Sequence, residues 1–204
     1  MALAGKRANV KVSGDSVIFE NESVLNLDDK NYQIEDVNKR VFDRKAEISV
    51  YVDEVITGES YSVNRLRGII EFDDEDSERG EVTLDGEYLP MSKAGGANEY
   101  DYTIEADNLE ATEFQSDWIT RVQGLLDISG SLSIWYDLDD YFADALMDES
   151  VVVIEFYSSD NVEPDLKCWA VLDSDEMSVA VDGLVEQSVD FEGTSDIDKR
   201  VVSI

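Results

Sequence analysis

The 204-residue chain contains no histidine, one cysteine and two prolines. Without histidine, it cannot build Ser-His-Asp or Cys-His nucleophile systems, or any metal site that uses imidazole. Cys168 has no second cysteine for an internal disulfide, and its apolar neighbours predict a buried strand residue rather than a reactive thiol. A chain of this length buries about 70% of its unfolded surface, so it needs no disulfide or metal to fold.

Basic residues are also scarce, with 16 Lys and Arg against 48 Asp and Glu and a formal net charge of −32. This balance argues against proteins that grip nucleic acids or anionic membranes through a basic surface. Hydrophobic residues make up 43% of the chain, so it is not a disordered acidic tail. The charge must cover a folded body and repel itself. A high-salt environment and a need to repel an anion both explain it, and they are compatible.

Long apolar runs are missing as well. No stretch approaches the roughly 20 apolar residues of a membrane helix, and the first residues contain no run of signal-peptide length. We therefore expect no membrane partner, and folding in a cytoplasm.

The apolar residues that are present alternate with polar ones in many short runs, which is typical of half-buried strands. The clearest run places Tyr100, Tyr102 and Ile104 on one face and acidic residues on the other. Leu126 to Ile134 and Val185 to Phe191 alternate in the same way. One segment, 137–147, instead has a helical stripe with Asp137 as its N-cap. A weaker helical turn is expected at 116–122. These patterns predict a mainly β fold of sandwich or barrel type with one flanking helix at about 137–147.

Candidate catalytic and metal sites are weak. With 48 acids, carboxylate pairs are unavoidable and carry no information. The acidic stretches 73–76 and 173–176 resemble weak cation loops but lack the spacing of an EF-hand, and solvated loops explain them better. We predict no catalytic residues, no metal site and no cofactor, and hence a structural protein rather than an enzyme.

Fragments along the chain, taken in order and spacing, resemble the tail tube protein, or major tail protein, of viruses with long tails. They span about Lys11 to Thr194, and the C-terminal signature is the most specific. The fragments lie at 32–43, 48–52, 61–63, 68–72, 88–91, 102–107, 112–114, 118, 168–171, 179–185 and 188–194.

The resemblance implies a β-sandwich flanked by a helix, in a single tail-tube domain of 1–204 in which about 28–80 is a candidate β-meander insertion. It implies homohexameric rings that stack into a hollow tail tube, with an inner β-barrel through which DNA passes during ejection without sequence-specific binding. Its partners are further copies of the chain and other tail proteins such as the tape measure, terminator and baseplate. Its place is the virion tail, after assembly in the host cytoplasm. The acidity suggests a salt-loving host.

Two alternatives remain open. One is another virion tail, neck or decoration protein that shares the module at 32–72. The other is an acidic β-module that binds calcium, remains a monomer and melts in a metal-dependent way.

If the chain forms a tube, the acidic strand faces are candidates for its bore. Each Lys or Arg that touches a phosphate releases counterions and creates a sticking point, whereas carboxylates repel DNA and let it slide. The alternative is that these residues face solvent on the outside of a sandwich. The candidate lumen-lining residues are Asp101, Glu105, Asp107, Asp127, Asp182, Glu186, Asp190 and Glu192.

Overall fold

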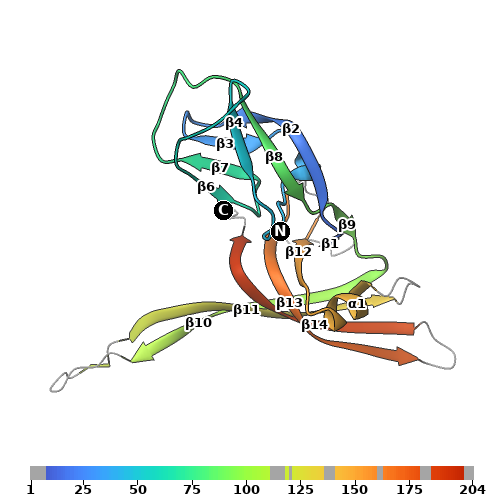
Figure 1. Ribbon diagram of the computed structural model, residues 1–204. Coiled ribbons are helices and arrows are strands. Elements are labelled where there is room, and N and C mark those ends of the chain that lie inside the picture. Colours follow the sequence, from blue (N-terminus) through green and yellow to red (C-terminus); the bar gives the residue numbers. More distant parts are fainter. Residues whose placement is uncertain are drawn as a thin grey trace. The chain divides into compact units, whose positions relative to one another are not determined.

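The computed structural model describes residues 8–110, 118–119, 121–135, 141–159, 163–179 and 185–199. Strands take up 61% of the chain, in two curled sheets, which confirms the mainly β prediction. The chain divides into two compact units, one built on Ala94–Lys199 and the other on Lys11–Lys93 (Figure 1). The candidate insertion at 28–80 falls within the second unit, and its status as an insertion stays a prediction. No helix among the described residues is long and apolar enough to span a bilayer.

The first unit is an antiparallel sheet in the order β10-β11-β14-β13-β12, together with helix α1. Its elements are β10 (Ala97–Glu110), β11 (Arg121–Trp135), α1 (Tyr141–Met147), β12 (Val151–Tyr157), β13 (Leu166–Val179) and β14 (Val185–Lys199). The second unit holds a sheet in the order β5-β4-β8-β2-β3-β7-β6 and a short 3-10 helix, η2. Its elements are β2 (Val17–Asn26), β3 (Asn31–Ile34), η2 (Val37–Lys39), β4 (Ser49–Val52), β5 (Val55–Ile56), β6 (Tyr61–Asn64), β7 (Ile69–Phe72) and β8 (Val82–Tyr88). The short strands β1 (Asn9–Ser13) and β9 (Met91–Lys93) pair with each other.

Aromatic rings from separate strands form the core of the first unit. The Phe156 ring of β12 lies 5.0 Å from Tyr100 and 5.5 Å from Tyr102, both on β10, and 5.6 Å from Phe191 on β14. Because β10 and β12 stand far apart in the sheet order, these contacts require the sheet to curl around its apolar face. Cys168 is fully buried in β13, where burial raises its pKa to about 12, so the prediction of a buried strand residue is confirmed.

Helix α1 confirms the predicted helix over 141–147 and packs on β13. Phe142 and Ala145, from the predicted stripe, are buried, while Asp137 and Leu138 lie outside the described residues. The helix ends where Glu149 takes a left-handed φ of 51°, and the Ser150 amide donates to the Ala145 carbonyl at 2.9 Å. This left-handed cap ends the helix at Met147.

The prediction of a helical turn at 116–122 is wrong for its last two residues. Arg121 and Val122 belong to β11, opposite Glu110 and Leu109 of β10. Pairing with a long neighbouring strand outweighs the weak local helical preference.

The second unit packs around a core with Phe42, Ile70 and Phe72 at its centre. The Tyr61 hydroxyl donates to the Ile48 carbonyl at 2.9 Å and so links the edge strand β6 to the chain that enters β4. Gly68 has a φ of +62°, and a Cβ there would stand 2.8 Å from the Arg40 carbonyl oxygen, so only glycine fits this turn.

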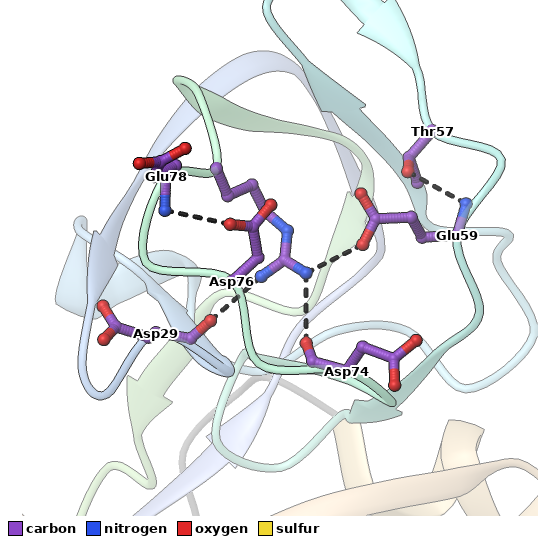
Figure 2. Close-up of polar contacts among 7 residues, drawn as sticks. Asp29, Thr57, Glu59, Asp74, Asp76 and Glu78 are labelled. Atoms are coloured by element: carbon purple, nitrogen blue, oxygen red, sulfur yellow. Dashed lines mark hydrogen bonds and ion pairs between the residues drawn. The ribbon is translucent and has the colours of Figure 1, made fainter.

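A buried arginine organises the acidic loop that follows β7. The side chains of 73–78 are exposed, as predicted, but the Arg79 guanidinium is only 1% exposed. It lies 3.8 Å from the centre of the Phe72 ring and donates to the carbonyls of Asp29 and Asp74 at 3.0 and 3.1 Å. It also donates to the Glu59 carboxylate at 2.7 Å (Figure 2). One cation therefore ties three separate segments together beneath an acidic surface.

Replacing Arg79 by Ala should destabilise the second unit by about 2–3 kcal/mol, because a buried cation–π contact and charge-assisted hydrogen bonds are lost together. Hydrogen exchange should speed up in 26–34 and 73–81 but not in peptides from Ala94–Lys199. Lys30→Ala is the matched control, since Lys30 makes a 3.5 Å ion pair with Glu71, whose side chain is half exposed. Equal hydrogen-exchange protection in the Arg79→Ala variant and the parent would show that Arg79 does not hold these segments together.

Candidate functional site: the acid-serine face

One face of the first unit's sheet carries acids and small hydroxyl residues on four adjacent strands. Antiparallel partners point to the same side of a sheet, and every second residue follows them, so the register defines this face. We call it the acid-serine face. Its polar members are Glu99, Asp101, Thr103 and Glu105 of β10; Asp127, Ser129, Ser131 and Ser133 of β11; Glu186, Ser188, Asp190 and Glu192 of β14; and Ser174, Glu176 and Ser178 of β13. Two exposed apolar side chains lie on the same side, Trp135 opposite Glu186 and Val171 opposite Glu192.

A single row crosses all four strands. Asp101 stands opposite Ser131, Ser131 opposite Asp190, and Asp190 opposite Ser174. The Ser131 hydroxyl donates to the Asp101 carboxylate at 2.7 Å, and the Ser174 hydroxyl donates to Asp190 at 2.9 Å. The serines therefore satisfy part of each carboxylate and hold it in place without neutralising its charge.

The neighbouring rows repeat this composition. Thr103 stands opposite Ser129, which stands opposite Glu192, and Glu105 stands opposite Asp127. Every acidic member of the acid-serine face is exposed. Like charges that stand directly opposite each other destabilise a sheet in dilute salt, so this face is costly for an isolated chain.

Almost no cation offsets this charge. Ala94–Lys199 contains 27 Asp and Glu but only three Lys and Arg, namely Arg121, Lys167 and Lys199. Lys167 is buried and pairs with Glu155 at 2.7 Å. The face therefore presents a negative potential that repels polyanions and gathers small cations.

The register brings together most of the predicted lumen residues. Asp101, Glu105, Asp127, Glu186, Asp190 and Glu192 share the acid-serine face. Asp107 is exposed and lies at the β10 irregularity between Ala106 and Asn108, and Asp182 lies outside the described residues. Whether this face lines a bore stays a prediction.

Sequence reasoning missed the contribution of β13. The prediction of a solvated loop at 173–176 is wrong, because these residues belong to strand β13, with Ser174 and Glu176 on the acid-serine face. A register shift between Leu172 and Ser174 breaks the alternation and hides the strand in the sequence. In the described parts of the chain, no group of three or more His, Cys, Asp or Glu is placed to hold a metal ion.

A buried ion pair lies at the other end of the same sheet. The Glu155 carboxylate of β12 accepts from the Tyr157 hydroxyl at 2.7 Å as well as from Lys167 of β13, which stands directly opposite it. Burial, followed by the charge of Glu155 and its hydrogen bond, raises the Tyr157 pKa well above its usual range. Tyr157 is therefore a neutral donor at physiological pH, and the three groups fix the β12–β13 register.

Two solved tail structures are similar to about half of this chain. No protein-family model and no curated protein matches the sequence. A chain from the tail of an empty gene transfer agent particle, refined with C6 symmetry, is 12% identical with a TM-score of 0.45, over 55% of this chain and 87% of that one. A chain from the virion of a native gene transfer agent particle is 12% identical with a TM-score of 0.47, over 54% of this chain and 89% of that one. Likeness at this level assigns the chain to no family.

Proposed function

We propose that this protein is the tail tube subunit of a long-tailed virus or virus-like particle. In this role, six copies form a ring, and the rings stack into the hollow tube through which DNA leaves the particle. The acid-serine face carries the proposal, because it gathers exposed carboxylates on four adjacent strands. It coincides with segments that resemble tail tube proteins in sequence, including 102–107 and 188–194.

Open strand edges in the first unit support assembly with further copies. Among the described residues, β10 pairs only with β11. The β11–β14 pairing stops at Ser129, whereas the β10–β11 pairing runs on to Arg121 (Figure 1). A two-stranded ribbon therefore extends beyond the sheet, and such ribbons are marginally stable alone. Pairing the edges of neighbouring copies into a closed barrel removes them.

Exposed apolar side chains accompany this ribbon. Leu125 is 82% exposed, Leu126 60% and Val122 52%, and Trp118 just before the strand is 84% exposed. Surfaces of this kind on a highly charged chain mark contacts with protein. A heterologous contact that closes after six copies gives a ring, and repetition along the axis gives a tube.

The acid-serine face is assigned to the bore of the tube. Carboxylates and hydroxyls offer no cationic side chain to the DNA phosphates. Duplex DNA therefore releases no counterions as it passes, and no tight contact slows it. Other tail proteins, such as the tape measure, terminator and baseplate, would contact the ends and interior of the tube. The protein would reside in the virion tail.

Reversing two acids of the acid-serine face tests this assignment. Glu186→Lys/Asp190→Lys should still form tubes in high salt but slow DNA release from assembled particles at least about tenfold, because each ring gains cations that bind phosphate. Asp74→Lys/Glu75→Lys is the matched control, with the same charge change on exposed loop residues of the second unit.

The two readouts separate the outcomes. Electron microscopy shows whether each variant forms tubes, and the release rate shows whether the bore has changed. If DNA release from Glu186→Lys/Asp190→Lys particles is unchanged, or is slowed equally in the control, the acid-serine face does not line the bore.

A further inference from the structure

The scarce basic residues are concentrated in one place. Lys11–Lys93 holds ten of the 16 Lys and Arg, and six of these ten fall in the two short segments 39–45 and 65–67. We call these six the basic patch. Its members are Lys39, Arg40, Arg44, Lys45, Arg65 and Arg67.

The fold brings the two segments into direct contact. The Phe42 amide donates to the Arg65 carbonyl at 2.8 Å, and the Arg65 guanidinium donates back to the Asp43 carbonyl at 2.5 Å. Gly68, at the end of the second segment, packs against the Arg40 backbone. The two segments of the basic patch therefore lie side by side, joined by backbone contacts and by the Arg65 side chain.

Nearby acids reduce the positive charge of the patch, and Glu22 and Asp36 both lie close enough to Lys39 to act on its charge. Lys39 binds the Glu22 carboxylate, a hydrogen bond that raises the Lys39 pKa. Segments 39–47 and 64–68 together hold six basic residues and only two acids, Asp43 and Glu47. Arg44, Lys45 and Arg67 are exposed, and the other three members of the patch are half-buried.

We propose that the basic patch docks on the acidic first unit of a second copy of this chain. This inference rests on the self-assembly proposed above. It adds a contact of opposite charge that offsets part of the repulsion between copies. Copies at −32 repel one another, and a local contact of opposite charge offsets part of that repulsion and fixes orientation.

Charge complementarity favours a second copy over a nucleic acid. The first unit offers 27 acids against three bases, the strongest imbalance in the chain. A polyanion that approached the patch would meet the repulsion of the whole acidic molecule, whereas a second copy can present its acids locally.

Charge reversal in the patch tests the contact. Arg44→Glu/Lys45→Glu should raise the concentration needed for half-assembly at least about tenfold, measured by sedimentation velocity at fixed salt, because attraction is replaced by like-charge repulsion. Lys30→Glu/Lys93→Glu is the matched control, because it changes the net charge equally at basic residues of the same unit outside the patch. It should raise the half-assembly concentration much less. Equal shifts in the two double variants would reduce the effect to net charge and overturn the inference.

Zero-length carbodiimide cross-linking identifies the occupant. In assemblies mixed from ¹⁴N- and ¹⁵N-labelled protein, Lys45 should link to carboxylates of 94–199 in pairs that combine the two labels. Cross-links found only between residues that carry the same label would overturn the inference. So would binding of the basic patch to added duplex DNA with loss of the mixed-label links. If the parent protein does not self-associate at any salt, the proposed function fails. If it assembles and the patch variant assembles equally well, only this inference fails.

Discussion

Replacing Lys167 by Met should destabilise the first unit by about 3–5 kcal/mol, because it leaves the Glu155 charge buried without its partner. The two side chains are 10% and 5% exposed, and they stand opposite each other on β13 and β12. All three tryptophans lie in Ala94–Lys199, so tryptophan fluorescence during urea unfolding reports on this unit.

A second variant separates the charge from the packing. Glu155→Leu/Lys167→Met removes both charges and should recover most of the loss, with about 1 kcal/mol remaining for the lost hydrogen bond from the Tyr157 hydroxyl to Glu155. Lys93→Met, at an exposed residue of β9, should change stability by less than about 0.5 kcal/mol. A single Lys167→Met variant that unfolds like the parent would show that the pair contributes nothing to stability.

Assembly should depend steeply on salt. A ring of six copies carries 192 formal negative charges. The screening length is about 8 Å at 0.15 M ionic strength and about 3 Å at 1 M, so repulsion across the acid-serine face fades as salt rises. Rings and tubes should therefore be scarce in dilute buffer and abundant in molar salt, as followed by sedimentation across a salt series.

The opposite result has a clear meaning. Tubes equally stable in dilute buffer and in molar salt would show that the acids hold bound cations, or lie too far apart in the assembly to repel one another. A comparison of NaCl with KCl at equal ionic strength separates these two cases, because two monovalent salts screen equally and only selective cation binding distinguishes them.

The alternation of apolar and polar residues in the sequence predicted which residues share a strand face. The run from Tyr100 to Asp107 and the run from Leu126 to Ile134 separate an apolar face from an acidic one, and the structure pairs these strands in that register. The same reasoning predicted the helix now seen at Tyr141–Met147, because its apolar stripe is local. Each of these features is encoded within about ten consecutive residues.

Features that depend on distant partners were not predictable in this way. Ser174 and Glu176 reach the acid-serine face only because a register shift in β13 reverses the alternation. Arg79 lies among acids in the sequence, yet its ring contact with Phe72 and its bond to Glu59 arise only when separate segments meet. The basic patch likewise needs the fold to join residues about 25 positions apart.

The most direct test of the account is an electron cryomicroscopy structure of the protein assembled in high salt. The account predicts tubes of stacked six-membered rings in which β10, β11 and β14 turn Asp101, Glu186 and Asp190 toward the bore. A tube with a basic or apolar bore, or with these carboxylates on its outer surface, would contradict it, as would a protein that stays monomeric at every salt concentration.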